Sequence, residues 1–193
     1  WKQWQDWKIE VWPSIDEIDD RAELIRSGTV WKTVENNLKK MNELENITIR
    51  PGLTIGAWNV FRLPEIIEKL VSIGIIREKH RYKNFFINLV FDPTHYHIHI
   101  LPDDFKKETS IKLKKFIEQY NSKYNTTIDH LFTHVLHELD QPFDEKAATR
   151  FLTVTEQVDA VRNENLFEVV PEMLKTKFEV EQRRSKFIPL KNT

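Results

Sequence analysis

A short stretch near the amino terminus, VWPSIDEIDDRAELIRSG, carries hydroxyl, carboxylate and guanidinium groups directly after an apolar run. Ser14 and Asp16 are two residues apart, so in a strand they point to the same side. Arg26 follows within a short loop and turn and can fold back over the same opening. A serine hydroxyl and an arginine fork both donate hydrogen bonds, which suits a carboxylate ligand. Because Asp16 would accept from an ammonium or hydroxyl group, the three residues fit an amino-acid-like ligand.

The same residues also have a purely structural interpretation, which their spacing alone favours. Serine and aspartate after a strand commonly cap the next turn. Arg21 and Arg26 can pair on the surface with the acidic neighbours in this segment, where such ion pairs contribute little. These neighbours are Asp19, Asp20 and Glu23. The choice between ligand site and capped turn therefore depends on what the rest of the sequence indicates.

Two groups of histidines could supply ligands to a zinc ion. They are His95, His97 and His99 in the segment HYHIH, and His130, His134 and His137, followed by Glu138, in a later segment with helical spacing. Alternate residues of a straight strand spread over more than ~13 Å, which is too far for one zinc ion. The second group is better placed, although it lacks the H-E-x-x-H spacing. A polar strand face and a solvated helix face are the simpler interpretation.

The overall composition limits the classes of function. The chain has 193 residues, enough to bury a core, and its formal net charge of -1 gives no strong signal for nucleic-acid binding. No apolar run is long enough for a transmembrane helix and no signal peptide is present, which predicts a cytoplasmic protein. The chain has no cysteine, so it cannot itself supply disulfides, thiolate metal ligands or cysteines for an iron–sulfur cluster. It begins with Trp1 rather than Met, which suggests a processed chain or a fragment.

Strands and helices alternate in the first half of the sequence. The predicted strands are 7–12, 47–55 and 84–91, and the predicted helices are 28–46 and 62–74. Pro51 predicts an irregularity in the second strand, and the strongly apolar third strand is suited to burial on both faces. Thr29 is a plausible N-cap, while Pro64 and Gly74 mark the start and end of the second helix. The alternation is typical of parallel α/β architecture, with too few strands for a closed eight-stranded barrel.

After Pro102 the pattern becomes helical. The spacing of apolar residues predicts helices within 110–120, 126–140 and 144–162, and a short one at 166–174. The segment that precedes them, 93–102, can be extended. The charged last stretch, 175–193, is predicted to be weakly ordered or to pair with something outside the chain.

The segment KIEVWPSIDEIDDRAELIRSGTVWKTVENNLKKMNEL resembles the middle of radical S-adenosylmethionine (radical SAM) enzymes, in particular the group with a shortened "twitch" C-terminal extension. In that family a strand ending in S-x-D is followed by an arginine. A tryptophan-containing helix with an asparagine near its centre comes next. The matching residues here are Ser14, Asp16, Arg26, Gly28, Trp31 and Asn36 or Asn37.

Later segments continue the resemblance in the same order, up to about residue 175. The stretch ITIRPGLTIGAWNVFRLPEIIEKL looks like the next strand and helix, with Asn59 before a leucine-proline-glutamate helix start. The stretch NLVFDPTHYHIHILPDDFK is similar to the following strand, with its leucine-proline pair and Lys106. The stretch FLTVTEQVDAVRNENLFEVVPEML is similar to the tail of the family, with its aspartate, arginine and proline-glutamate pair.

The resemblance implies a partial parallel (β/α) barrel of about three to four strands at 1–106, followed by a mostly helical C-terminal region and charged tail at 107–193. In such enzymes the strand-end serine and the following arginine hold the carboxylate of S-adenosylmethionine, which points to Ser14 and Arg26. The aspartate, Asp16, would lie close to the methionine end or support the loop. Residues near Asn59 would approach the ribose.

The cluster motif of the family, C-x-x-x-C-x-x-C, belongs after the first barrel strand and is absent from this cysteine-free chain. A four-iron four-sulfur cluster would therefore be ligated only in a full-length protein, where a missing N-terminal half-barrel would be the partner of this chain. The resemblance thus implies a C-terminal fragment that contributes to S-adenosylmethionine binding and is inactive by itself. Its substrate stays open among peptides, nucleotide precursors and small metabolites.

Two other functions remain open. An α/β interaction module without chemistry would use the aromatic N-terminal region, where Trp1, Trp4 and Trp7 have helical spacing and Trp12 follows. A metal-dependent enzyme would use the histidines. The assignment of the S-adenosylmethionine site requires that the side chains of Ser14 and Arg26 converge at the carboxyl ends of the strands.

Overall fold

Two small parallel sheets form the centre of the N-terminal part of the protein. The computed structural model describes residues 4–77 and 85–186. The first sheet contains β1 (Ile9–Val11) and β3 (Ile47–Ile49), and the second contains, in order, β2 (Ser14–Ile15), β4 (Gly52–Ile55) and β5 (Phe86–Leu89). All pairings within these sheets are parallel, as the alternating sequence pattern predicts.

Two prolines interrupt the strand pairing. The first directly follows the strand predicted at 7–12, and the second divides the strand predicted as continuous at 47–55. Pro13 separates β1 from β2, and Pro51 separates β3 from β4. Proline has no N–H to give to a ladder, so each strand breaks where it occurs. The pairing still runs across the break, because Arg50 N donates to Val11 O and Gly52 N donates to Pro13 O, both at 2.9 Å. The irregularity predicted at Pro51 is confirmed.

Helices connect the strands. Helices α1 (Asp19–Ile25) and α2 (Trp31–Asn42) lie between β2 and β3, and α3 (Leu63–Ser72) follows β4 after a 3-10 turn, Val60–Arg62. The boundaries of α3 agree with the proline and glycine signals. The N-cap predicted at Thr29 is wrong: α2 starts one residue later, at the N-cap Val30. The side chain of Glu23, on α1, accepts from Trp31 N (3.0 Å) and takes over the capping.

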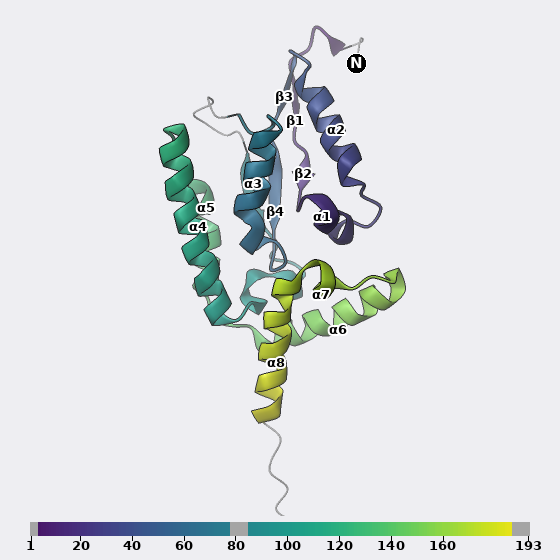
Figure 1. Cartoon of the computed structure of the whole chain (residues 1–193), viewed down its shortest axis with the longest axis vertical. Coiled ribbons are helices and arrows are strands. Elements are labelled where there is room, and N and C mark those ends of the chain that lie inside the picture. The colour runs from purple at the N-terminus through teal and green to yellow at the C-terminus, as the bar shows by residue number, and fades with distance from the viewer. Residues whose placement is uncertain (1–3, 78–84, 187–193) are drawn as a thin grey trace, which may run out of the picture.

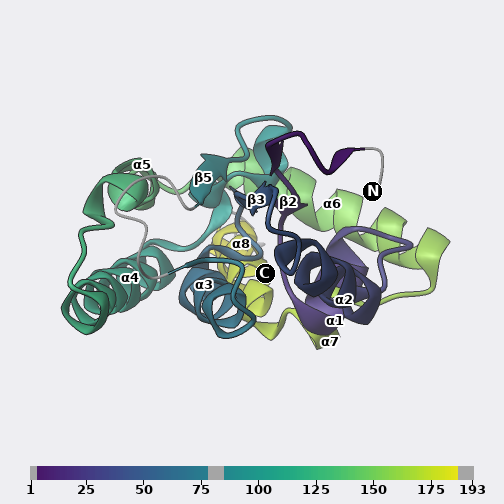
Figure 2. The ribbon, with the colours of Figure 1, turned by 90° about the horizontal axis from the view of Figure 1, so that it is seen from above.

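One face of the second sheet is covered by helices and the other carries exposed polar residues. Leu53 and Ile55 of β4 are fully buried, and Ile15, which pairs with Leu53, is buried with them. Figure 2 shows α1, α2 and α3 together on one side of the strands. Ser14 and Asn88 point to the opposite face and are exposed, because strand residues alternate between faces. The expectation that the third strand is buried on both faces is therefore wrong.

The second half of the chain is helical, as predicted. It consists of α4 (Asp103–Tyr124), α5 (Asp129–Leu139), α6 (Glu145–Arg162), α7 (Leu166–Val169), a 3-10 turn (Pro171–Met173) and α8 (Leu174–Lys186). Figure 1 shows α6, α7 and α8 beyond the carboxyl ends of the strands. The expectation of weak order is wrong for 175–186, which belong to α8, where Thr176 and Val180 are buried. The rest of that stretch, 187–193, lies outside the described residues.

The histidine-rich segment is not extended. It forms two successive 3-10 turns, Thr94–Tyr96 and Ile98–Ile100. Ile98 and Ile100 are fully buried in the core, and the coiled backbone gives neighbouring side chains directions that a strand does not allow. The predicted strand face with three histidines is therefore wrong.

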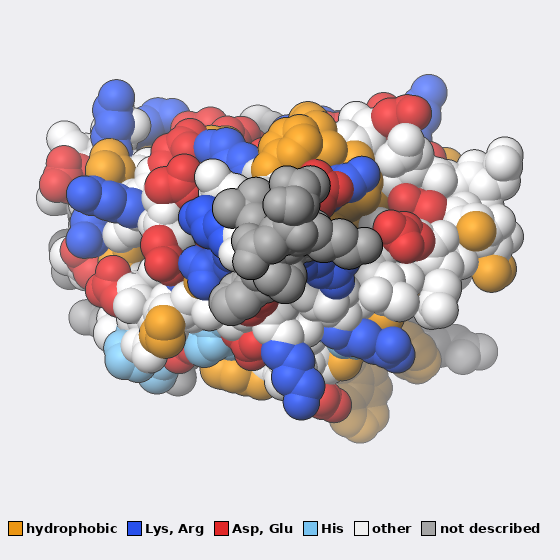
Figure 3. All heavy atoms as spheres, turned by 90° about the horizontal axis from the view of Figure 1, so that it is seen from below, with side chains coloured by type: hydrophobic (Ala, Val, Ile, Leu, Met, Phe, Trp, Pro, Cys, Tyr) orange, Lys and Arg blue, Asp and Glu red, His pale blue; other side chains and the backbone are white. Residues whose placement is uncertain are grey.

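The α/β class with a mostly helical C-terminal region is confirmed, while barrel geometry stays a prediction. One buried apolar cluster runs from Ile15 to Val180. Residue 106, at the end of the first predicted domain, lies in the first turn of α4, and the division of the chain there also stays a prediction. Within 4–77 and 85–186, no helix is both long and apolar enough to cross a membrane. Basic and acidic side chains are mixed on the face seen in Figure 3.

Candidate functional site

The side chains of Ser14, Asp16 and Arg26, which we call the clamp, converge at the end of β2. Nε of Arg26 donates to Oδ2 of Asp16 (2.5 Å), and Nη2 of Arg26 donates to Oγ of Ser14 (2.9 Å). Arg26 is the C-cap residue of α1, so this short helix, which the sequence pattern does not predict, brings the guanidinium back over the strand. The geometric condition for a shared site is met.

The clamp keeps hydrogen-bonding capacity for a ligand. The side chain of Arg26 is 52% exposed, whereas that of Asp16 is only 12% exposed. Nη1 of Arg26 makes no hydrogen bond to the described residues, and the guanidinium therefore has free N–H groups. The clamp holds one positive and one negative charge. A zwitterionic ligand matches it, because its carboxylate and ammonium can each pair with the opposite charge.

A pocket of about 120 Å³ lies beside the clamp, between the end of β2 and helices α1 and α2. All three clamp residues line it, together with Thr29 and Trp31. Pockets that enclose drug-sized ligands are larger, about 300–1,000 Å³. This pocket is therefore suited to one polar end of a larger molecule rather than to the whole of it.

The fourth predicted site residue, Asn59, is fully buried and holds two strand ends together. Its Nδ2 donates to the backbone carbonyls of Asp16 (2.5 Å) and Thr54 (2.9 Å), and its Oδ1 accepts from Gly56 N (2.8 Å). These bonds use both amide N–H groups. Asn59 thus fixes the backbone next to the clamp. Contact with a ribose stays a prediction, and it concerns the residues near Asn59.

A buried carboxylate next to the clamp was missed by sequence reasoning. The side chain of Glu17 has no exposed surface, and its Oε1 accepts from Ile18 N (3.1 Å) and from Nη2 of Arg62 (3.4 Å). Burial raises the pKa of Glu17 to about 7, although the charges of Arg62 and Arg21 act in the opposite direction. The sequence signal that could have indicated its burial is its position between two isoleucines, Ile15 and Ile18, which are both buried.

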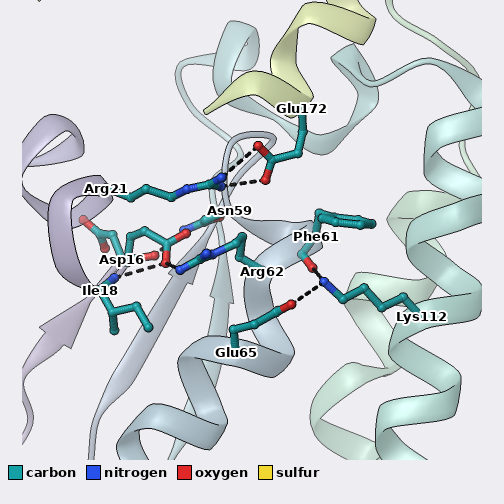
Figure 4. Close-up of polar contacts among 10 residues, drawn as sticks. Asp16, Ile18, Arg21, Asn59, Phe61, Arg62, Glu65, Lys112 and Glu172 are labelled. Carbon is teal, nitrogen blue, oxygen red and sulfur yellow. Dashed lines mark hydrogen bonds and ion pairs between the residues drawn. The ribbon is translucent and has the colours of Figure 1, made fainter. Parts of the chain in front are cut away.

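Arg21 connects this edge of the sheet to the C-terminal region. Its Nη1 and Nη2 donate to the two carboxylate oxygens of Glu172, at 2.6 and 2.9 Å (Figure 4). Burial raises the pKa of Glu172, but the hydrogen bonds from Arg21, a backbone hydrogen bond and the charges of Arg21 and Arg62 together outweigh it, so the net shift is downward. The surface pairing expected for Arg21 with its acidic neighbours is therefore replaced by a bond to a distant residue.

A second pocket, of about 140 Å³, adjoins the same helix. It is lined by Leu24 and Ile25 of α1, by Trp58 and Tyr96, and by residues of α6 that include Asp159 and Arg162. Trp58 and Tyr96 meet edge to face, with ring centroids 4.6 Å apart. Nη1 of Arg162 donates to Leu24 O (3.1 Å). The lining also includes Glu164, which pairs with Arg162 (3.8 Å). Aromatic walls with a few charged groups suit a small polar molecule.

The histidines are regrouped by the fold. His97 and His99 meet Glu138 of α5, and the nitrogen and oxygen atoms that could bind a metal all lie within 4.8 Å of one another. His95 does not belong to this group, and neither do His130, His134 and His137 of the predicted helical group. Neither of the two histidine sets considered from the sequence comes together as a whole. His97 and His99 belong to the first set, and Glu138 follows the second.

We expect Asn59→Ala to destabilise the protein by about 2–4 kcal/mol, since it removes three hydrogen bonds and leaves buried backbone groups without partners. Urea unfolding monitored by circular dichroism measures this loss. Asn46→Ala is the matched control, because Nδ2 of Asn46 also donates to two backbone carbonyls, those of Trp4 and Trp7, but at an exposed site. Equal losses in the two variants would contradict the role assigned to Asn59.

We expect Glu17→Gln to stabilise the protein at about pH 8 by about 3 kcal/mol and to have little effect at about pH 4. The pKa of Glu17 is about 7 in the folded chain against a model value of 4.5. Between these values the folded chain binds the extra proton, so the free energy of unfolding falls as pH rises through this window. Urea unfolding at several pH values measures the difference between variant and wild type.

Glu35→Gln is the control for this pH dependence. Hydrogen bonds from Lys39 and Lys69 lower the pKa of Glu35, which is the opposite direction to Glu17. Neutralising Glu35 should therefore give no stabilisation as pH rises. If the stability difference between wild type and Glu17→Gln stayed constant with pH, the pKa of Glu17 would not be raised, and the prediction would be wrong.

Comparison with known proteins adds no relative to this picture. No family model, no curated protein and no solved structure matches the chain. The site is therefore defined by its own geometry: a partly open serine–aspartate–arginine clamp at the carboxyl end of a parallel strand, with two small pockets beside it.

Proposed function

We propose that this chain supplies the S-adenosylmethionine-binding part of a radical SAM enzyme. The observation that carries the proposal is the convergence of Ser14 and Arg26 at the carboxyl end of β2. In parallel α/β folds, ligands bind at the carboxyl ends of the strands. The order of sequence segments that resembles this family supports the same assignment.

The clamp residues have separate tasks in this proposal. Arg26 and Ser14 donate hydrogen bonds to the carboxylate of S-adenosylmethionine, and Asp16 accepts from its ammonium group. Before the ligand binds, Asp16 holds the guanidinium in place through its bond to Nε (2.5 Å). Asn59 fixes the Asp16 backbone, so the clamp is organised before the ligand arrives.

The exposed face of the second sheet supports the proposal that this chain has a partner. Ser14 and Asn88 are exposed there, and Oγ of Ser14 lies 3.3 Å from Oγ1 of Thr54 on the same face. In a (β/α) barrel the face away from the helices is enclosed by the remaining strands. The proposed partner is therefore an N-terminal half-barrel that covers this face.

The radical chemistry requires groups that this chain does not provide. A four-iron four-sulfur cluster supplies the electron that cleaves S-adenosylmethionine in this family, and its cysteine ligands must lie outside this cysteine-free chain. What this chain's residues do is bind and orient the amino-acid end. The second pocket, with Trp58, Tyr96 and Arg162, is the proposed place for a substrate that is a peptide, a nucleotide precursor or a small metabolite.

An interaction module without chemistry is the second candidate, favoured by the exposed aromatic residues near the amino terminus. Trp4, Trp7 and Trp12 are 53%, 70% and 57% exposed, which is unusual for so large an apolar side chain. Trp1 lies outside the described residues. A partner that binds this region does not need the clamp, so the two candidates differ in which substitutions affect them.

We expect S-adenosylmethionine to bind the chain and Arg26→Gln to weaken this binding at least about tenfold, since it removes a charge-assisted pair of hydrogen bonds. Nuclear magnetic resonance detects weak binding, and the indole signal of Trp31 reports on the pocket that this residue lines. Arg50→Gln is the matched control, because Arg50 pairs with Glu10 away from the clamp.

Two results would contradict the proposal. One is the absence of any shift of the Trp31 signal up to about 10 mM S-adenosylmethionine, a concentration that reveals even millimolar affinity. The other is an equal loss of affinity in Arg26→Gln and Arg50→Gln, which would indicate unspecific attraction of a charged ligand. Methionine alone should compete, since the clamp is assigned to the amino-acid end.

A further inference from the structure

Two histidines and a glutamate form a compact group near β5, whereas the clamp lies at β2, the other edge strand of the second sheet. His97 and His99 come from the turns that follow β5, and Glu138 comes from α5. We propose that this histidine–glutamate cluster (His97, His99 and Glu138) binds a divalent transition-metal ion of the zinc class. The proposal is independent of S-adenosylmethionine binding, because no clamp residue takes part in it.

The donor set suits such an ion. Imidazole nitrogen and carboxylate oxygen are common zinc ligands, with bonds of about 2.0–2.2 Å. In a tetrahedral site these bonds place neighbouring ligand atoms about 3.3 Å apart. Oε2 of Glu138 lies 3.7 Å from Nε2 of His97 and 2.7 Å from Nε2 of His99, which are distances on either side of that value. All candidate ligand atoms lie within 4.8 Å of one another, so side-chain rotations must bring some of them closer together around an ion.

His97 supplies the second observation that points to a ligand. Its side chain is only 7% exposed, yet its Nε2 has no hydrogen-bond partner among the described residues and lies 3.7 Å from Oε2 of Glu138. A buried polar nitrogen without a partner is costly unless something pairs with it. A metal ion between His97 and Glu138 would remove this cost.

The ring of His97 is held in place by its other nitrogen. Nδ1 accepts from His99 N at 3.3 Å, a long bond. Coordination through Nε2 by the neutral imidazole moves the ring proton to Nδ1, and this weak bond is then lost.

The surroundings both support the cluster and leave it accessible. Asp144 N, at the start of α6, donates to His99 O (2.9 Å) and fixes the turn, while the negative charge of Asp144 acts on His97. The side chain of His99 is 30% exposed, which gives an ion a path from solvent. Three protein ligands leave a fourth position for water. The bound ion joins the turn after β5 to α5 and stabilises the contact between them.

The test starts from chain that has been freed of metal with a chelator. We expect one Zn²⁺ to bind per chain with a Kd below about 10 μM in calorimetry, and Co²⁺ to give the strong visible absorption of a tetrahedral site. Zinc at about 100 times its Kd should raise the melting temperature by about 5–10 °C. These readouts need neither a substrate nor an iron–sulfur cluster.

Substitutions at two positions of α5 distinguish zinc binding at the cluster from zinc binding at surface histidines. Glu138→Gln should weaken zinc binding at least about tenfold, since it removes the charged ligand and keeps the shape of the side chain. His134→Ala, on the exposed face of α5, should leave binding unchanged. His99→Gln provides a second ligand variant at a partly exposed position, and circular dichroism checks that each variant is folded.

The proposal is overturned by either of two outcomes. The first is that wild-type chain shows no saturable zinc binding and no cobalt absorption. The second is that His134→Ala lowers the affinity as much as Glu138→Gln, which would assign the ion to exposed histidines of α5. Loss of binding in both Glu138→Gln and His99→Gln with an unchanged His134→Ala supports the cluster.

Discussion

The buried amide of Asn59 is the interaction on which the candidate site depends. It joins the backbone after β2 to the end of β4 and closes the turn at Gly56. Because the Asp16 carbonyl is one of its partners, Asn59 fixes the backbone that positions the Asp16 carboxylate. That carboxylate in turn orients Arg26, whose guanidinium reaches Ser14. A single buried side chain thus organises groups that are exposed.

A second layer of buried charge connects this edge to the helical region. Arg62 lies beside Glu17, and Arg21 binds Glu172 through two hydrogen bonds (Figure 4). Removing these ions from water is costly, so they are weak evidence for stability by themselves. What they provide is position: the bidentate geometry of Arg21 allows one placement of the 171–173 turn against α1. The carboxyl edge of the strands is therefore held from both halves of the chain.

The fold was predictable where local rules act alone. Apolar periodicity indicates α3, α4, α5 and α6, and proline chemistry explains the break at Pro51. Prediction failed where distant partners decide. The start of α2 is capped by Glu23 rather than by Thr29, and the histidine segment coils because Ile98 and Ile100 are drawn into the core. Neither partner is visible in a short window of sequence.

The sequence by itself determined which chemical groups are present: a serine, an aspartate and an arginine after one strand, histidines in two segments, and no cysteine. It also determined the α/β class, because strand and helix periods are local properties. Only the tertiary structure decided which groups meet. Arg26 returns to Ser14 because α1 reverses the chain, and His99 meets Glu138 because α5 packs beside the turns after β5. Contacts between residues far apart in sequence depend on packing of the whole core, which residue spacing does not encode.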